Sequence, residues 1–318
     1  MELIEGIEKI SEPLHNAVVT IGNFDGVHLG HQALFRMVIA KARLLDGKAV
    51  AITFEPHPVR VLKQNGLPPL ITMYERKIEL IARTGIDVLI CIQFTPEFAA
   101  LSPQAFVVDL LINRIGMKAI VVGEDYTFGK NREGNLTLLH AYARQFDFNV
   151  YTVGEIRTSD SSVQRISSTS IRDLVMEGDM DSARTLLGRN YQIRGDVIPG
   201  RNRGGRQLGF PTANIRMQNE LCPKTGIYAV TVDFENASYP GVANIGYSPT
   251  FDDRQFTIEV HLIGFSGDLY GKHLRVNFVK RLRDEKRFGN PAELSAQIKQ
   301  DVTDARKILA ASESPARI

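Results

Sequence analysis

The stretch AVVTIGNFDGVHLGH (residues 17–31) joins a short apolar run to a glycine-rich turn and then to the start of a helical pattern. The run AVVTIG is apolar on both faces, which is typical of a buried strand in a parallel sheet. Gly22, Gly26 and Gly30 let the backbone of the turn approach a ligand closely, and the N–H groups at a helix N-terminus suit a phosphate. The stretch therefore predicts a strand–loop–helix unit that binds a phosphate group.

The same alternation of strand and helix patterns extends to about Leu187. Four more runs rich in Val and Ile predict buried strands: KAVAITF (48–54), DVLICIQF (87–94), KAIVVG (118–123) and NVYTV (149–153). Three helical patterns lie between them: residues 31–45, a segment opened by a capping box of Thr72 and Glu75, and a segment opened by Ser102-Pro103. Strand–helix alternation of this kind predicts a doubly wound, Rossmann-like α/β domain.

The pattern changes after the helical stretch DMDSARTLLG (179–188). From Tyr191 to Leu282 the chain is a series of short β-like runs separated by Gly, Pro and Asn. Such a series predicts an antiparallel barrel or sandwich. Asn290-Pro291 then predicts the start of a final helix, with the asparagine as its cap and Glu293 in the first turn.

Length and composition limit the class of protein. A chain of 318 residues suits two domains of about 150 residues each, and we expect the boundary to separate residues 1–187 from 188–318. Lys and Arg total 38 against 36 Asp and Glu, and this near balance gives no support for a nucleic-acid partner. The two cysteines, Cys91 and Cys222, lie too far apart for a zinc ribbon and disfavour a disulfide framework. No apolar run approaches the ~18 residues of a membrane span. We therefore expect a reduced, cytoplasmic protein without a membrane partner.

The first candidate site contains two histidines. His28 and His31 are three residues apart, so the helical pattern places both imidazoles on the same side of its first turn. Beside a helix N-terminus they suit the negative charge that develops on an α-phosphate during nucleotidyl transfer. No GKS or GKT follows, so the stretch is not a P-loop. The alternative is a glycine turn that carries two surface histidines.

A second phosphate-binding segment follows the fifth strand. ISSTSIR (166–172) begins a helical pattern in which Ser167, Ser168 and Thr169 can cap the helix and bind phosphate. Arg172 then offers a guanidinium fork for phosphates or for departing pyrophosphate. Taken alone, this motif is more often a simple helix cap.

The second candidate site lies in the β-rich half. In PGRNRGGRQLGFPTAN (199–214), Thr212 and Asn214 alternate along an extended segment, so their oxygens face one side and could bind a metal or phosphate. In FTIEVHLIGF (256–265), Thr257, Glu259 and His261 likewise share one face. The alternatives are a solvent-exposed polar strand face and a mobile basic loop that binds RNA.

Taken together, these motifs resemble one prokaryotic family, the bifunctional riboflavin kinase/FAD synthetases. GNFDGVHLGHQ resembles the HxGH signature of the family's adenylyltransferase module. GRQLGFPTAN, GIYAV, GVANIGYSPTF and EVHLIGFSGDLYGK resemble its riboflavin kinase module. The resemblance covers residues 15 to 306. It implies a Rossmann-like nucleotidyltransferase domain followed by an antiparallel β-barrel kinase domain with a C-terminal helix.

The resemblance also implies a chemistry and its partners. Riboflavin and ATP would give FMN and ADP, and FMN and ATP would then give FAD and pyrophosphate. Mg²⁺ would accompany ATP, without a tightly held, protein-ligated metal. We expect a monomer or a weak homo-oligomer. Two alternatives stay open: that only one module is active, or that the chain is a non-catalytic regulator that binds flavin or nucleotide.

The family's roles fall on particular residues of this chain. Glu259 would be the catalytic base of the kinase, and His28 and His31 would steady the adenylyl-transfer transition state. Residues implied in nucleotide or phosphate binding are Gly22, Asn23, Phe24, Asp25, Gly26, Gly30, Ser167, Ser168, Thr169, Arg172, Gly200, Arg206, Gly209, Pro211, Thr212 and Asn214, of which Thr212 and Asn214 would also hold the metal. Residues implied in flavin binding are His57, Asp125, Phe128 and Arg283. Where many members carry Phe-Arg, this chain has Tyr126-Thr127, so no arginine contact is carried over at that loop.

Overall fold

The computed structural model describes residues 1–63, 66–156, 166–199, 209–247 and 256–313. By their internal contacts these residues form two compact units, Met1–Ser168 and Thr169–Ile318. Two helices, α6 (Ser168–Glu177) and α7 (Met180–Leu187), separate this division from the expected boundary at 187/188. That boundary concerns functional modules and stays a prediction.

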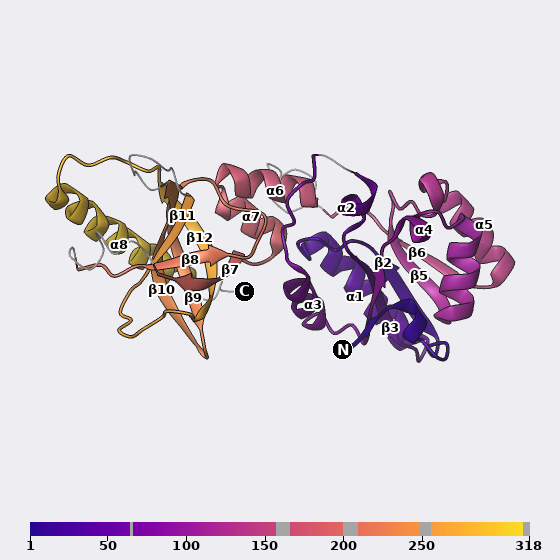
Figure 1. Cartoon of the computed structure of the whole chain (residues 1–318). Helices are drawn as coiled ribbons and strands as arrows, with labels where there is room; N and C mark the ends of the chain where they lie inside the picture. Colours follow the sequence, from indigo (N-terminus) through magenta and orange to yellow (C-terminus); the bar gives the residue numbers. More distant parts are fainter. Residues whose placement is uncertain (64–65, 157–165, 200–208, 248–255, 314–318) are drawn as a thin grey trace. The chain divides into compact units, whose positions relative to one another are not determined.

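A six-stranded parallel sheet forms the centre of the first unit (Figure 1). Its strands in spatial order are β1 (Glu2–Glu5), β4 (Val88–Gln93), β3 (Ala49–Glu55), β2 (Ala17–Ile21), β5 (Met117–Gly123) and β6 (Asn149–Val153). The five predicted strands are all present and all parallel. The direction in which the chain adds strands reverses between β2 and β5, and such a switch point opens a crevice at the carboxyl ends of the strands.

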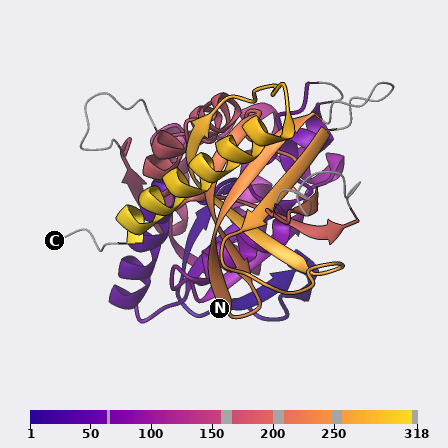
Figure 2. The same ribbon diagram turned by 90° about the vertical axis from the view of Figure 1, so that its left-hand side faces the viewer.

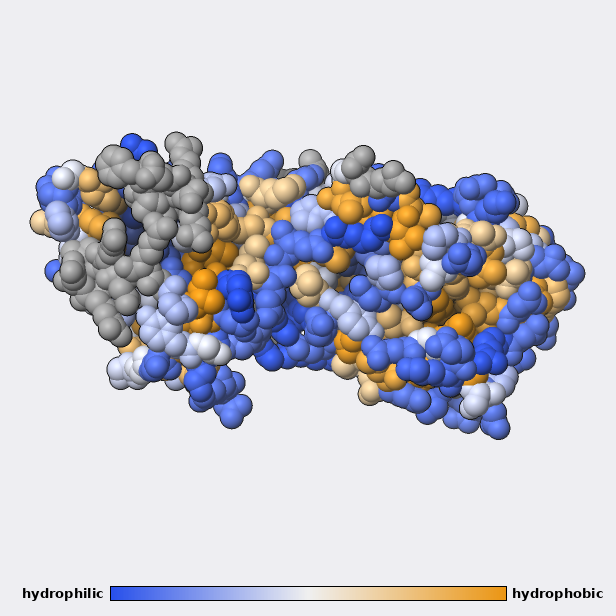
Figure 3. Space-filling view, in the orientation of Figure 1, coloured by the Kyte–Doolittle hydropathy of each residue, from blue (hydrophilic) through white to orange (hydrophobic). Residues whose placement is uncertain are grey.

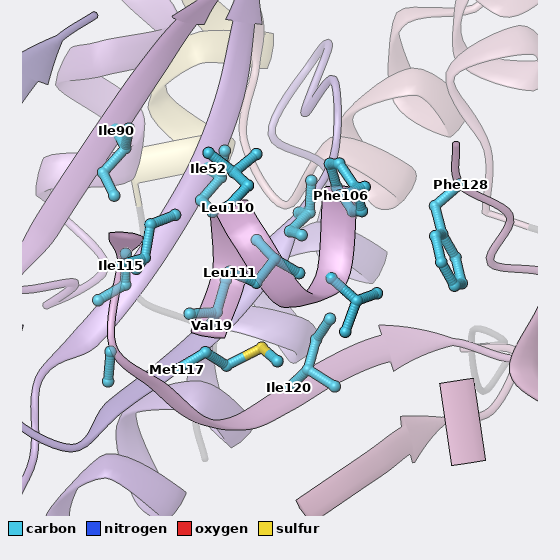
Figure 4. Packing of buried hydrophobic residues seen from close by; sticks show 14 of the residues in the cluster. Val19, Ile52, Ile90, Phe106, Leu110, Leu111, Ile115, Met117, Ile120 and Phe128 are labelled. Carbon is cyan, nitrogen blue, oxygen red and sulfur yellow. The ribbon is translucent and has the colours of Figure 1, made fainter. Parts of the chain in front are cut away.

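Helices cover both faces of this sheet, which confirms the doubly wound α/β prediction. On one face, α1 (Leu29–Leu44) and α3 (Tyr74–Ala82) contribute Phe35, Val38 and Ile81 to a buried cluster. On the other, η2 (Ala105–Arg114) packs Phe106, Leu110 and Leu111 against strand side chains such as Ile52 and Val19 (Figure 4). The remaining helices of this unit are η1 (Ile7–Lys9), α2 (Pro58–Leu62), α4 (Pro96–Ala99), η3 (Lys130–Arg132) and α5 (Leu136–Phe146).

Two predicted helix starts have different outcomes. The Ser102 hydroxyl accepts a hydrogen bond from the Ala105 N–H at 3.1 Å, so the predicted cap is confirmed, although most of this helix has π geometry. The predicted capping box of Thr72 and Glu75 is wrong. Helix α3 begins after Met73 without a side-chain cap, because the Thr72 hydroxyl lies instead against the Asp25 carboxylate, 3.4 Å away.

The second unit contains a closed antiparallel barrel, which resolves the choice between barrel and sandwich. Its strands in spatial order are β10 (Ala237–Tyr247), β11 (Phe256–Leu262), β8 (Ala213–Met217), β7 (Tyr191–Ile198), β12 (His273–Arg283) and β9 (Gly226–Phe234). Buried and half-buried residues alternate strictly along β7, so every second side chain fills the interior.

The final helix, α8 (Pro291–Glu313), packs across β9, β10 and β12 (Figure 2). Its predicted cap is confirmed, because Asn290 Oδ1 accepts from the Glu293 N–H at 2.9 Å and its amide donates to the Glu293 carboxylate. Ala305 and Leu309 bury the inner side of this helix against Ala229 and Val279 of the barrel. The helix therefore covers one side of the barrel.

No helix within the described ranges is both long enough and apolar enough to cross a membrane. Hydrophilic residues are interspersed with smaller hydrophobic areas over the surface seen in Figure 3.

Candidate active sites

The first unit has a cavity of about 510 Å³ at the carboxyl ends of β2, β5 and β6. This is the switch point of the sheet, where open α/β folds bind their ligands. The cavity is lined by Ile21, Gly22, Phe24, His28, Gly30, His31, Leu34, Gly123, Glu124, Asp125, Tyr126, Val153, Gly154, Glu155, Ile156, Ile166, Ser167 and Ser168. Three sequence segments predicted to bind nucleotide or flavin therefore meet at one cavity.

The two histidines lie closer together than their spacing alone implies. Helix α1 begins at Leu29, and His28 is its cap, since His28 Nδ1 accepts from the His31 N–H at 3.3 Å. The imidazole rings stack with their centroids 3.5 Å apart. With Nδ1 accepting, a neutral His28 ring carries its proton on Nε2. Both imidazole rings line the cavity, so the stacked pair lies next to any ligand bound there.

Gly30 is required by this stacking. A Cβ atom at position 30 would lie 3.1 Å from Cε1 and Nδ1 of the His28 ring, closer than such contacts normally are. An alanine would therefore push the His28 ring away from its position over His31. Gly26 is required for a different reason, because its φ of +85° is a left-handed conformation that side chains disfavour.

Asp25 stabilises the glycine-rich loop by hydrogen bonds to a distant segment of the chain. Its side chain is 4% exposed, and its carboxylate accepts from the Ile71 N–H at 3.0 Å and from the Thr72 N–H at 3.1 Å. The Thr72 hydroxyl in turn accepts from the Gly26 N–H at 3.1 Å. Asn23, Asp25 and Gly26 are not among the cavity-lining residues. In this structure Asp25 and Gly26 therefore stabilise the glycine-rich loop through contacts with Ile71 and Thr72 outside the cavity lining.

Lys77 is a further support that the sequence analysis missed. This side chain is 5% exposed, and its ammonium donates to the carbonyls of Asn23 at 3.5 Å and Phe54 at 3.4 Å. It thereby ties the glycine-rich loop to the end of β3. Burial lowers the pKa of Lys77, against the opposing effects of Glu55, Cys91 and Asp25. The available signal was its helical spacing with Leu80 and Ile81, the other buried residues of α3.

The serine-rich segment reaches the same loop. The Ser168 hydroxyl donates to the Asp25 carbonyl at 2.9 Å, and Ser167 and Ser168 both line the cavity. Thr169 and Arg172 belong to the second compact unit, on helix α6, where Arg172 is 8% exposed.

The predicted flavin-binding residues of the first unit lie in different environments. Asp125 lines the cavity. Phe128 is buried and stacks on Tyr126 with ring centroids 5.6 Å apart, so it supports the cavity wall from the core. His57 caps helix α2, where its Nδ1 accepts from the Val59 N–H at 3.2 Å.

On the barrel, the predicted kinase residues come together by strand register. Glu259 of β11 pairs directly with Asn214 of β8 and, on its other side, with Asn244 of β10. Residues paired in register point to the same face of a sheet. Their neighbours Ala213, Ile258 and Val260 are buried, whereas these three are half-buried, so the polar row lies on the outer face of the barrel. Asn244 was not predicted, although the motif that contains it was.

Burial raises the pKa of the Glu259 carboxyl above its ordinary value. A raised pKa suits a carboxylate that must accept a proton near neutral pH. The adjoining loop is held by His261, whose Nδ1 lies 2.8 Å from the Pro211 carbonyl, while Thr212 is exposed. Gly209 has a φ of +81°.

Two predicted residues of the basic loop, Gly200 and Arg206, lie outside the described residues. Arg283, at the end of β12, forms a two-pronged ion pair with Asp301 of α8, at 2.9 Å from Nε and 2.7 Å from Nη2. Asp301 is 5% exposed, and both residues line a second cavity of about 370 Å³ between β12 and α8. The guanidinium of Arg283 thus anchors α8 to the barrel at the edge of this cavity.

Comparisons with known proteins match the two halves of the chain separately. The family model of FAD synthetase matches residues 10–170, and that of riboflavin kinase matches residues 187–309. A bifunctional riboflavin kinase/FMN adenylyltransferase from Escherichia coli K12 is 38% identical over 96% of this chain and 97% of its own length. The protein of the same name from Pseudomonas fluorescens is 37% identical over 98% of this chain and 99% of its own.

A crystal structure described as a macrolide-efflux protein from Streptococcus pneumoniae has the same fold, with a TM-score of 0.86 and 32% sequence identity over 96% of this chain and 99% of that one. The two family models match the chain one after the other, and the full-length relatives are named for both activities. The chain belongs to the bifunctional riboflavin kinase/FMN adenylyltransferase family.

Proposed function

We propose that this chain phosphorylates riboflavin to FMN on its barrel and adenylylates FMN to FAD at the cavity of its parallel sheet. The observation that carries the proposal furthest is the register that pairs Glu259 with Asn214. A base next to a phosphate- or metal-binding amide is what transfer of a phosphoryl group to a hydroxyl requires. We keep residues 1–187 and 188–318 as the two functional modules.

In the kinase reaction, the 5′-oxygen of riboflavin forms a bond to the γ-phosphorus of ATP while the bond to ADP breaks. Glu259 accepts the hydroxyl proton, and its raised pKa matches that task. Thr212 and Asn214 offer the hydroxyl and amide oxygens that Mg²⁺ prefers, and a bound Mg²⁺ would neutralise charge on the phosphates. Gly209 and Pro211 shape the loop that leads into this segment.

In the adenylyltransferase reaction, a phosphate oxygen of FMN forms a bond to the α-phosphorus of ATP, and pyrophosphate leaves. No covalent intermediate is needed, because positioning and charge stabilisation suffice. The stacked pair of His28 and His31 faces the cavity and supplies N–H donors to the charge that develops on the α-phosphate. Ser167 supplies a hydroxyl to the same ligand, while the Ser168 hydroxyl donates to the Asp25 carbonyl and leaves the Ser168 backbone N–H at the start of α6 for the phosphate. Arg172 is proposed to bind the triphosphate.

The experiment compares one variant of each site with a matched surface control. Glu259→Gln is expected to abolish FMN formation while FAD formation from added FMN continues, and exposed Glu235→Gln to leave both rates unchanged. His28→Ala is expected to abolish FAD formation while FMN formation continues, and exposed His140→Ala to leave both unchanged. A Glu259→Gln protein that still phosphorylates riboflavin at the wild-type rate would refute the assignment of the base.

The other readings predict different results with the same proteins. If only one module is active, one of the two wild-type rates is absent from the start. A flavin-binding regulator would bind flavin and turn over neither substrate. The expected cytoplasmic location, the monomeric or weakly associated state, and the absence of nucleic-acid and membrane partners remain predictions.

A further inference from the structure

Asn244 completes the polar row on the barrel. It stands opposite Glu259 in the register of β10 and β11, on the side of Glu259 away from Asn214. Its side-chain oxygen is buried and has no hydrogen-bond partner among the described residues. Buried amide oxygens without a partner are rare in folded proteins. We therefore expect this oxygen to accept a hydrogen bond from a group outside the described residues, such as a bound ligand.

The register gives the row a direction. Neighbouring strands are ~4.8 Å apart, so the three side chains span ~10 Å from Asn214 through Glu259 to Asn244. The proposed phosphate and metal ligands lie at the Asn214 end, and the base lies in the middle. The attacked hydroxyl must lie beside Glu259, in line with the phosphate that it receives. The rest of the hydroxyl-bearing substrate must then continue toward Asn244.

The chemistry of the Asn244 oxygen selects the ligand group. An amide oxygen only accepts hydrogen bonds, so it cannot pair with a fully ionised phosphate, which also only accepts. Hydroxyl groups of a polyol chain do donate. Riboflavin carries such a chain, the ribityl group, between its ring and the 5′-hydroxyl that is phosphorylated.

We propose that Asn244 is a substrate-binding residue of the kinase site, where its side-chain oxygen accepts a hydrogen bond from a ribityl hydroxyl of riboflavin. This assignment rests on the proposed kinase reaction on the barrel. It adds a specificity element to that reaction: a residue that selects the polyol chain and not the isoalloxazine ring.

The test uses full-length Asn244→Leu and Asn244→Ser proteins. Leucine keeps the branched shape and removes the hydrogen-bond acceptor, whereas serine keeps an acceptor oxygen on a shorter side chain. The assay measures the KM for riboflavin, the KM for ATP, and the inhibition constant of lumiflavin, which has the same ring with a methyl group in place of the ribityl chain. Reading lumiflavin as an inhibitor of FMN formation reports on the kinase site alone.

For Asn244→Leu we expect the KM for riboflavin to rise about tenfold, the worth of one hydrogen bond, with a smaller rise for serine. The inhibition constant of lumiflavin and the KM for ATP should not change. The unfolding temperature should not fall, because leucine removes an unpaired polar atom. A parallel rise for riboflavin and lumiflavin would overturn the proposal, as would an effect on ATP alone or no effect at all.

Asn277→Leu is the matched control. Asn277 lies on β12, and its amide donates to Asp233 at 3.0 Å and to the Thr231 hydroxyl at 3.2 Å. Its loss should lower the unfolding temperature and leave the KM for riboflavin unchanged. The rate of FMN formation at saturating riboflavin, together with the KM for ATP, verifies that the barrel of each variant is folded. A wild-type protein that makes no FMN would refute the kinase reaction itself, and that result is distinct from failure of the Asn244 assignment.

Discussion

Removal of the Asp25 carboxylate should destabilise the first unit selectively. Asp25→Ala leaves the buried N–H groups of Ile71 and Thr72 without an acceptor. An unsatisfied buried donor costs about 1–3 kcal/mol, so two donors cost about 4 kcal/mol at the middle of that range. For a unit of this size, 1 kcal/mol shifts the unfolding temperature by about 2–4 °C, which gives a decrease of about 8–16 °C.

Scanning calorimetry of the full-length protein, together with both activities, would measure this effect. We expect the transition that accompanies loss of FMN adenylylation to move down, while riboflavin phosphorylation keeps its wild-type thermal profile. Asp109→Ala, an exposed aspartate on η2 of the same unit, is the control, and it should stay within about 0.5 kcal/mol of wild type. If Asp25→Ala unfolds like wild type yet forms no FAD, the reasoning is refuted, because Asp25 would then act on substrate instead of supporting the loop.

Three further perturbations have defined outcomes. Burial raises the pKa of Glu259 above 4.5, so ionisation of this carboxyl lowers the free energy of unfolding. This loss of stability is absent below the unfolded pKa and is complete once the pH has risen through the folded pKa. Glu259→Gln should therefore unfold at a higher temperature than wild type at pH 8 but not at pH 4, and equal differences at both pH values would contradict this. Asp301→Ala removes both carboxylate oxygens that pair with the Arg283 guanidinium, which keeps its hydrogen bond to the Asp284 carbonyl. Urea unfolding of the barrel should show a loss of about 1–3 kcal/mol in the free energy of unfolding, and an unchanged free energy would contradict this. Lys77→Met should lower kcat/KM for FMN adenylylation by about 10- to 100-fold through misplacement of the loop while the kinase rate is kept, and loss of both rates would count against a local role.

Much of the fold could be predicted because buried strands carry their own signal. The five predicted strands of the sheet, β2 to β6, are short runs rich in Val and Ile. A series of β-like runs without helices between them predicted a barrel or a sandwich, and the structure has the barrel. Strand β1 was missed because ELIE is only four residues long, begins and ends with glutamate, and lies at an edge of the sheet. Helix α1 begins two residues before its predicted start, since an imidazole, and not a typical hydroxyl or carboxylate, caps it.

The site was predicted less completely, because its supporting contacts join distant parts of the chain. Thr72 fits a local capping box, but its hydroxyl donates instead to the carboxylate of Asp25, 47 residues away in the sequence. Lys77 was missed because lysine is rarely buried, and its helical spacing with Leu80 and Ile81 was the single signal of its burial. Asn244 lies on a half-polar strand, and such a face looks solvent-exposed until the pairing of β10 with β11 places it beside Glu259.

The central claim is that one chain makes FMN on its barrel and FAD at the cavity of its sheet. A time course of the purified protein with riboflavin, ATP and Mg²⁺, with the three flavins separated by chromatography, tests it most directly. We predict that FMN rises and then falls as FAD accumulates. If neither riboflavin nor added FMN is converted, the claim is contradicted.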